Sequence, residues 1–186
     1  MNQSIWQWLF FALGSAGFFT FSLPSLRSLR SHGFYRFFAF EGILALVALN
    51  APVWFRDPLR PPQILSWFLL LGSLSLALHG FWLLRQIGRP DPAIADPTRL
   101  GIEKTTRLVT IGAYRWIRHP LYASLFCAGW GAFFKRPDRV GLGLAVIVTA
   151  ALYLTARAEE AENLRNFGEE YAAYMRKTKR FIPFVF

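Results

Sequence analysis

Apolar residues gather in five segments along the chain, and polar stretches separate them. Three long segments cover residues 5–23, 37–55 and 64–84, and two shorter ones cover 120–134 and 140–155. About 20 apolar residues are needed to cross the hydrocarbon core of a bilayer, so each long segment predicts a transmembrane helix. The two shorter segments are expected to pair as a tight helical hairpin. The predicted fold is therefore all-α, a polytopic membrane protein with about five transmembrane helices.

We expect residues 1–186 to form a single membrane domain that includes the polar stretches between and after the spans. Three spans occupy residues 1–87, a long polar loop occupies 88–119, and the helical hairpin occupies 120–157. The tail, 158–186, alternates charged residues with aromatic ones at helical spacing, which is typical of an amphipathic helix lying on a membrane face.

Composition agrees with this membrane assignment. Hydrophobic residues make up 54% of the chain, and the mean hydropathy is +0.30. The net charge of +10 would suggest nucleic-acid binding in a soluble protein, but here the basic residues flank apolar segments, so we expect no nucleic-acid partner. Cys127 is the only cysteine, which excludes an internal disulfide. Because the three histidines are far apart in sequence, no metal site is expected.

The basic residues predict how the spans are oriented. The polar stretches 24–36 and 85–119 and the tail from residue 157 are rich in Lys and Arg. The loops expected at the other membrane face, between the second and third spans and between the two short segments, carry only Arg56, Arg60, Lys135, Arg136 and Arg139. By the positive-inside rule, the long loop and the C-terminus are expected to lie in the cytoplasm.

Residues 112–122 hold the most informative polar group in the chain. Proline pushes the residue before it out of the α region, so His119 is expected to be extended and Pro120 to start a helix. The free N–H groups at the start of that helix, beside Arg118 and His119, predict a binding site for an anionic group.

A second polar group lies where the last span meets the tail. Arg157 precedes Glu159 and Glu160, and at about 100° per residue the two acids point in different directions from a helix. A solvated helix turn explains them equally well when they are taken alone. On the predicted topology, however, they lie at the same membrane face as His119.

Two ionisable residues lie within the expected spans. Glu41 is either a functional intramembrane acid or, more simply, an acid near the interface that pairs with Arg36 or reaches water. His79 is either catalytic or, more simply, a neutral histidine hydrogen-bonded between helices.

Four ordered motifs resemble a known family. They are Leu-Val-Thr-x-Gly-x-Tyr at 108–114, Arg-His-Pro-x-Tyr at 118–122, Glu-Glu at 159–160, and Phe-Gly-x-x-Tyr-x-x-Tyr from 167 with Ile-Pro at 182–183. Together they are similar to the isoprenylcysteine carboxyl methyltransferase and phospholipid N-methyltransferase group of integral-membrane enzymes. The resemblance covers roughly residues 99–186. Ser124 departs from it, because many members have glycine there.

The resemblance implies S-adenosylmethionine as the methyl donor, bound by the cytoplasmic loop and the tail. Its carboxylate needs cations or N–H groups, its adenine an apolar or aromatic wall, and its ammonium or ribose hydroxyls an acceptor. The residues implied to bind it are Thr106, Arg107, Leu108, Val109, Tyr114, Arg118, His119, Pro120, Leu121, Tyr122 and Glu160. The catalytic candidates are Arg157, which would position a carboxylate acceptor, and Glu159, which would take a proton from an amine acceptor.

The implied acceptor is a lipid or lipid-like molecule of the bilayer. A phospholipid amine is favoured because the chain is short and its tail basic, while a prenylcysteine carboxylate or a smaller hydrophobic acid or thiol stays open. Two other interpretations compete: an NADPH-dependent membrane reductase of the sterol-reductase type, and a non-enzymatic membrane scaffold or transporter subunit. Leu121 and the pair Glu159-Glu160 argue against the reductase, and the ordered polar motifs argue against the scaffold.

Overall fold

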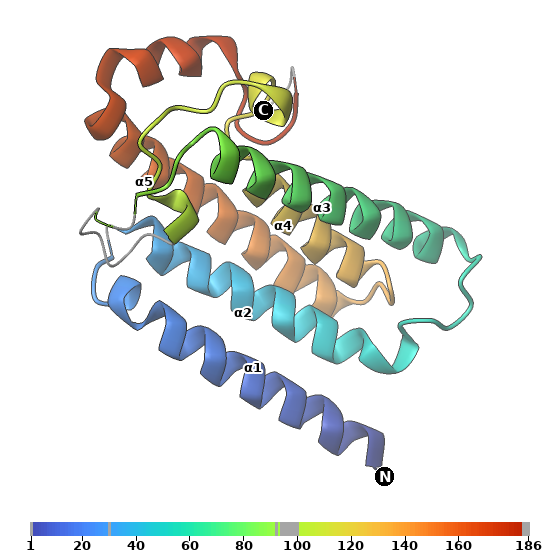
Figure 1. The fold of residues 1–186 in the computed structure, drawn as a ribbon. Helices are drawn as coiled ribbons and strands as arrows, with labels where there is room; N and C mark the ends of the chain where they lie inside the picture. The colour runs from blue at the N-terminus through green and yellow to red at the C-terminus, as the bar shows by residue number, and fades with distance from the viewer. Residues whose placement is uncertain (1, 30, 92, 94–100, 184–186) are drawn as a thin grey trace.

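The structure, a computed structural model, describes residues 2–29, 31–91, 93 and 101–183, with side chains from residue 5 onward. Over these residues it is a bundle of helices without strands, which confirms the predicted all-α class (Figure 1). The main helices are α1 (Asn2–Leu26), α2 (His32–Asn50), α3 (Pro61–Gln86), α4 (Pro120–Phe133) and α5 (Arg139–Lys177). Three short 3-10 helices, η1 (Ala51–Val53), η2 (Gly101–Glu103) and η3 (Gly112–Arg115), lie in the connections.

Among the described residues, four segments are long and apolar enough to cross a membrane, namely Ile5–Leu26, His32–Val53, Pro61–Gln86 and Arg139–Lys177. The remaining helix, α4, has 14 residues. At a rise of about 1.5 Å per residue it is shorter than the hydrocarbon core of about 30 Å. Five helices therefore build the bundle as predicted, but α4 is too short to cross a bilayer by itself.

A side-chain cap sets the start of α2. Ser31 has an extended backbone, and its hydroxyl accepts a hydrogen bond from the Gly33 N–H at 3.1 Å. The helix therefore begins at His32 rather than at the predicted residue 37. Because α2 begins earlier than predicted, His32 and Arg36 belong to its first two turns. Both residues therefore lie at the end of the bundle where α2 begins.

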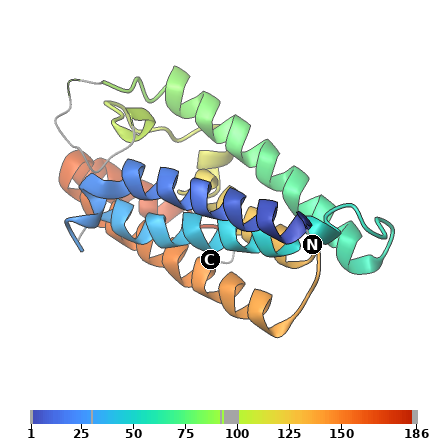
Figure 2. The same cartoon turned by 90° about the horizontal axis from the view of Figure 1, so that it is seen from below.

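Helix α1 lies on the outside of the bundle and packs along α2 (Figure 2). The rings of Phe18 and Phe40 stack with centroids 5.1 Å apart. The Ser15 hydroxyl donates to the Glu41 carboxylate at 2.8 Å. Glu41 therefore joins the two helices, and it is not the partner of Arg36, which binds Glu103 instead.

The apolar core lies between α2, α4 and α5. Its most buried residues are Ala39, Leu46, Ala132, Ala145, Val148, Leu152 and Ala156. Small residues let the helices approach closely: an added Cβ at Gly42 of α2 would lie 2.5 Å from the Val148 side chain of α5. Helix α3 packs along α4, where the Ser66 hydroxyl donates to the Gly131 carbonyl at 2.7 Å.

Helix α5 continues past residue 157, where the hairpin was expected to end and the tail to begin. No Pro or Gly interrupts residues 144–167, so the last span and the first part of the tail form one helix. At Gly168 a φ of 53° and a ψ of −130° turn the chain sharply, a conformation that only glycine adopts without strain. Figure 1 shows the segment beyond it folding back over the end of the bundle.

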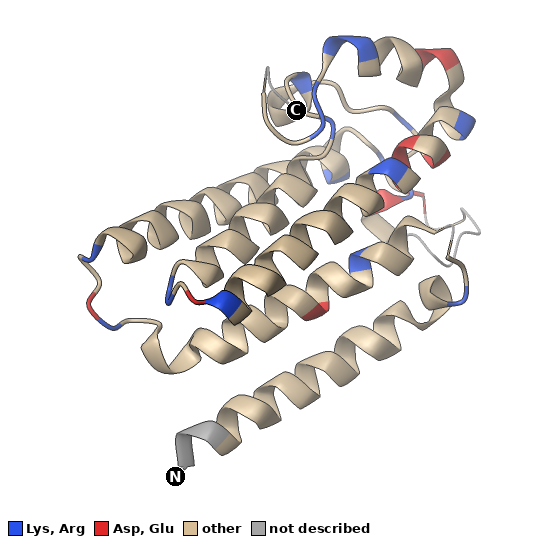
Figure 3. Cartoon of the chain, turned by 180° about the vertical axis from the view of Figure 1, so that it is seen from behind, with Lys and Arg blue, Asp and Glu red and all other residues tan. Residues whose placement is uncertain are grey.

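Charged residues lie mostly at the two ends of the bundle, and few of them lie along the helices between these ends (Figure 3). Trp6, Phe68, Leu71 and Leu78 are among the large apolar side chains exposed on these helices. Such a surface is typical of helices that face lipid. We call the end that holds residues 101–120 and 157–183 the site end, and the opposite end the far end.

Candidate active site

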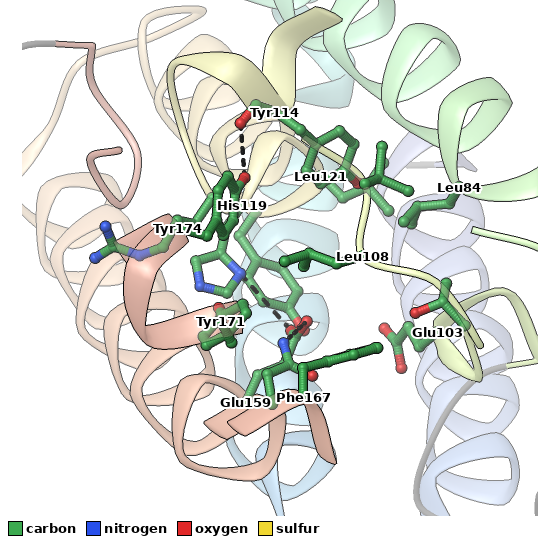
Figure 4. Close-up of a pocket in the computed structure, with 15 residues that line it drawn as sticks. Leu84, Glu103, Leu108, Tyr114, His119, Leu121, Glu159, Phe167, Tyr171 and Tyr174 are labelled. Carbon is green, nitrogen blue, oxygen red and sulfur yellow. Dashed lines mark hydrogen bonds and ion pairs between the residues drawn. The ribbon is translucent and has the colours of Figure 1, made fainter. Parts of the chain in front are cut away.

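A pocket opens at the site end, where the long loop, the start of α4 and the outer part of α5 meet (Figure 4). It encloses about 620 Å³ when the space at its mouth is included. Its lining residues are Leu84, Glu103, Thr105, Leu108, Val109, Tyr114, Arg118, His119, Leu121, Tyr122, Glu159, Asn163, Phe167, Tyr171 and Tyr174. The two polar groups singled out in the sequence therefore meet in one place.

The start of α4 places His119 in the pocket. Its φ of −126° and ψ of 64° lie outside the helical region and Pro120 is the first residue of α4, which confirms the predicted helix start. The His119 ring stacks on the Tyr122 ring with centroids 5.4 Å apart. Its Nε2 lies 3.3 Å from Glu160 Oε1 and its Nδ1 lies 3.8 Å from Glu159 Oε2, so the ring contacts both acids.

Glu160 is buried behind the pocket lining and binds two arginines. Arg118 Nε donates to its Oε1 at 2.8 Å, and Arg180 Nη2 donates to its Oε2 at 2.6 Å. Arg118 also donates to the carbonyl oxygens of Met175 and Thr178. Arg118 was expected to bind an anionic ligand. In the structure its guanidinium binds a carboxylate and two carbonyl oxygens of the protein instead.

The segment after α5 is fixed to the segment before α4 by backbone hydrogen bonds. Ile117 and Lys179 form a parallel bridge. The Arg118 N–H donates to the Lys179 carbonyl at 2.7 Å, and the His119 N–H donates to the Arg180 carbonyl at 3.2 Å. Together with Glu160, these bonds make the C-terminal segment part of the site.

Aromatic side chains from α5 form one wall of the pocket. After the turn at Gly168, Tyr171 and Tyr174 lie over the pocket, and the Tyr174 hydroxyl donates to the Tyr114 carbonyl at 2.7 Å. Burial raises the pKa of Tyr114 well above its usual value, so its hydroxyl stays protonated. The Tyr122 hydroxyl is buried at the pocket close to the Glu159 carboxylate, and no hydrogen bond of normal length joins it to a described residue. A ligand in the pocket can supply a closer partner.

Glu103, at the end of η2, is an acid of the pocket that sequence reasoning missed. Arg36 Nη1 lies 2.5 and 2.7 Å from its two carboxylate oxygens, and His32 Nε2 lies 3.2 Å from one of them. Burial alone would raise the pKa of Glu103, but the hydrogen bonds and charges of His32 and Arg36 outweigh it and lower the pKa to about 2. The carboxylate is therefore ionised at neutral pH.

Four further predicted residues lie outside the pocket lining. Thr106 and Arg107 are exposed in a turn, where their backbone N–H groups donate to the same carbonyl oxygen. Pro120 is buried as the first residue of α4. Arg157 is exposed, and its guanidinium lies 5.9 Å from the centre of the Tyr153 ring.

His79 supports the loop that carries Tyr114. Its Nε2 accepts a hydrogen bond from the Ala113 N–H at 3.3 Å. An added Cβ at Gly112, where φ is 60°, would lie 2.5 Å from that nitrogen. The histidine is thus hydrogen-bonded between a helix and the loop, close to the simpler of the two interpretations.

The sequence marked some of the unexpected lining residues but not others. Phe167, Tyr171 and Tyr174 belong to the fourth motif, but the sequence predicts for them only a tail on the membrane face, whereas they line the pocket. Asn163 lies one helical turn after Glu159 and could have been placed beside it. Glu103 is different, because its partners His32 and Arg36 are distant in sequence and no local pattern connects them.

Comparison with known proteins decides the family. A model of the phospholipid methyltransferase family matches residues 63–170, which is more than half of the chain. The chain belongs to this family. The protein-S-isoprenylcysteine O-methyltransferase of Homo sapiens is 32% identical over 83 residues, and those of Mus musculus and Rattus norvegicus match to the same extent. The human match covers 44% of this chain and 29% of that protein, so the chain spans less than a third of these relatives. No solved structure matches the chain.

Membership of the phospholipid methyltransferase family indicates a methyltransferase, and the apolar helices fit a multi-pass membrane protein. The match favours the methyltransferase interpretation over the reductase and the scaffold. The matched range begins at the start of α3 and ends just beyond Gly168 in α5, so it contains most of the pocket lining. Helices α1 and α2 lie outside it.

Proposed function

We propose that the chain is an S-adenosylmethionine-dependent methyltransferase of the membrane that acts on a lipid or lipid-like acceptor. The observation that supports this proposal is that the four sequence motifs meet at one pocket. The residues of these motifs either line the pocket or contact its lining, and the pocket lies at the end of an apolar helical bundle. The family match supplies the reaction class, and the chemistry of the pocket supports the donor.

The lining residues suit this donor. Leu108, Val109 and Tyr114 offer an apolar and aromatic wall for the adenine. The Glu159 carboxylate offers an acceptor for the ammonium or the ribose hydroxyls, and the buried Tyr122 hydroxyl, which makes no hydrogen bond of normal length to the described residues, would gain a closer partner. The residues implied by the resemblance but lying outside the lining, such as Glu160 and Pro120, would act by fixing the backbone of the pocket.

S-adenosylmethionine supplies a methyl group on a sulfonium, which is open to in-line displacement. The residues of the chain would hold the acceptor in line and exclude water. For an amine acceptor we assign the proton to Glu159, whose carboxylate oxygens lie 3.5 Å from Asn163 Nδ2 and 3.8 Å from His119 Nδ1. For a carboxylate acceptor, Arg157 would hold the acidic group.

An apolar groove beside the pocket suits the chain of a lipid acceptor. It lies between α3, α4 and α5, is lined by residues such as Phe126, Leu152 and Phe181, and encloses about 1090 Å³ including its open side. The Phe181 ring lies 6.2 Å from the His119 ring, measured between centroids, so the groove adjoins the pocket. Tyr153 also lines the groove and contacts Arg157, which places this cation near the groove's edge.

The basic residues support a cytoplasmic position for the site end. The residue ranges that define this end include Arg118, Arg157, Arg176, Lys177 and Lys179, in agreement with the positive-inside rule. A cytoplasmic mouth would give a water-soluble donor access to the pocket, while the acceptor enters sideways from the bilayer.

Transfer of a labelled methyl group from S-adenosylmethionine tests the proposal. Purified protein is incubated with a total lipid extract and with prenylcysteine analogues, and the products are separated. We expect label in a lipid or prenylcysteine fraction, and where the labelled product is a lipid amine, Glu159→Gln should lower the rate about 100-fold. The matched control is Glu169→Gln, because Glu169 lies just beyond the turn at Gly168 in α5 with its side chain 82% exposed. Absence of both labelling and S-adenosylhomocysteine binding would contradict the proposal.

A further inference from the structure

A buried ion cluster at the site end joins three separate parts of the chain. It consists of His32 and Arg36 on the first turns of α2, Glu103 at the end of η2, and Glu162 on α5. Arg36 Nη1 lies 2.5 and 2.7 Å from the two oxygens of Glu103. His32 Nε2 lies 3.2 Å from Glu103 Oε2, and His32 Nδ1 lies 2.8 Å from Glu162 Oε2.

The geometry defines the charge of His32. Both of its ring nitrogens face carboxylate oxygens, and ionised carboxylates only accept hydrogen bonds. When both carboxylates are ionised, both nitrogens donate, and the ring is then an imidazolium. The side chain is 1% exposed, so water cannot replace either partner. His32 thus links the carboxylates of Glu103 and Glu162, and its backbone N–H also donates to Glu162 at 3.3 Å.

The cluster borders the pocket on two sides. Glu103 lines the pocket from the loop. Glu162 lies three residues after Glu159 and one before Asn163, and both of these line the pocket from α5. A displacement of either acid of the cluster would therefore move one wall of the pocket. Helix α2, which supplies both cations, lies outside the residues 63–170 that the family model matches.

We propose that His32 and Arg36 are positioning residues for the donor pocket, and that α2 is consequently part of the catalytic unit. This inference rests on the proposed function of the pocket. Arg36 fixes the carboxylate of Glu103, and His32 holds that carboxylate at a set distance from α5. Neither cation lines the pocket, so both act through Glu103 and Glu162.

Binding of S-adenosylhomocysteine by calorimetry in detergent, with methyl-transfer kinetics, tests this role. Arg36→Met and His32→Gln should raise the dissociation constant and the KM for S-adenosylmethionine roughly 10- to 100-fold, because small displacements in a binding site have large effects. The change in kcat should be smaller than the change in KM. Arg36→Lys, which keeps the charge but loses the planar fork, should give an intermediate value, and it replaces Arg36→Met if that variant does not fold.

A double-mutant cycle separates positioning from general stability. If Arg36 acts through Glu103, Arg36→Met should have little further effect on affinity once Glu103→Gln is present. The matched control is Lys135→Met at the far end, where a buried cation lies 3.2 Å from the centre of the Trp67 ring and 3.1 Å from Gln63 Oε1. That variant should lower the melting temperature and leave the affinity for S-adenosylhomocysteine within twofold.

The outcomes distinguish the inference from the function on which it rests. Wild-type protein that binds S-adenosylhomocysteine, together with folded Arg36 and His32 variants of unchanged affinity, would overturn the inference alone. Additive effects of Arg36→Met and Glu103→Gln would also overturn it. A folded wild-type protein that does not bind S-adenosylhomocysteine would overturn the proposed function and the positioning role with it.

Discussion

Glu160 should be one of the most sensitive positions in the molecule. Its carboxylate is 5% exposed and accepts hydrogen bonds from Arg118 at 2.8 Å and from Arg180 at 3.1 and 2.6 Å. Replacing it with alanine would leave two guanidinium groups facing each other without an acid between them. Removal of one partner of a buried ion pair costs about 3–5 kcal/mol. Arg180 is 17% exposed and can turn partly toward water, so we expect the lower half of that range.

This free energy converts into a measurable shift of the melting temperature. For a chain of about this size, 1 kcal/mol corresponds to roughly 2–4 °C. Glu160→Ala should therefore melt roughly 6–16 °C below the wild-type protein in detergent, as followed by tryptophan fluorescence. Because Arg118 also holds the carbonyl oxygens at the end of α5, the same variant should bind S-adenosylhomocysteine more weakly at temperatures where it is still folded.

The matched control is an exposed acid of α5 that lies just beyond the turn at Gly168. Glu169 pairs with Arg176 at 2.8 Å, but the two side chains are 82% and 65% exposed. Exposed pairs contribute about 0–1 kcal/mol, so Glu169→Ala should shift the melting temperature by a few degrees at most. Equal melting temperatures for Glu160→Ala and Glu169→Ala, with equal affinity for S-adenosylhomocysteine, would refute the stabilising role assigned to the ion pairs of Glu160 with Arg118 and Arg180.

Single substitutions at two glycines and one acid test other parts of the structure. Gly168→Ala should destabilise the turn in α5 by about 1–3 kcal/mol, because φ is 53° and ψ is −130° there, and limited proteolysis should cut near residue 168 more rapidly. Gly112→Ala should displace His79, since an added Cβ would lie 2.5 Å from its Nε2, and calorimetry should show weaker donor binding. The pKa of Glu103 is lowered from 4.5 to about 2 by His32 and Arg36, so its ionised form stabilises the fold above pH 4.5. That stability should be lost as the pH falls from 4.5 toward 2, and a melting-temperature profile should show a smaller decline in Glu103→Gln.

The parts of the site that follow from local rules could be predicted from the sequence. Proline restricts both its own backbone and that of the residue before it, so the position of His119 and the start of α4 followed from residues 118–120 alone. The different directions of Glu159 and Glu160 followed from helical geometry, and the structure resolves them: Glu159 lines the pocket and Glu160 lies behind it.

The parts that depend on distant contacts could not be predicted. Nothing near Glu103 indicates that His32 and Arg36 lie beside it, because the three meet only when the loop folds against α2. The boundary expected at residue 157 is the point where apolar residues give way to charged ones. The helix itself continues to residue 168, where a glycine permits the chain to turn. Arg157 is the cation expected to hold a carboxylate acceptor, and its contact with Tyr153 beside the groove also depends on the packing of the bundle.

Ultraviolet cross-linking of labelled S-adenosylmethionine, followed by peptide mapping, tests whether the pocket binds the methyl donor. We expect label on peptides that contain residues 103–122 or 159–174, and protection of both by S-adenosylhomocysteine. Glu160→Ala should reduce the labelling more than Glu169→Ala does. Label confined to other peptides, or protection by NADPH but not by S-adenosylhomocysteine, would contradict the assignment of the pocket to a methyl donor.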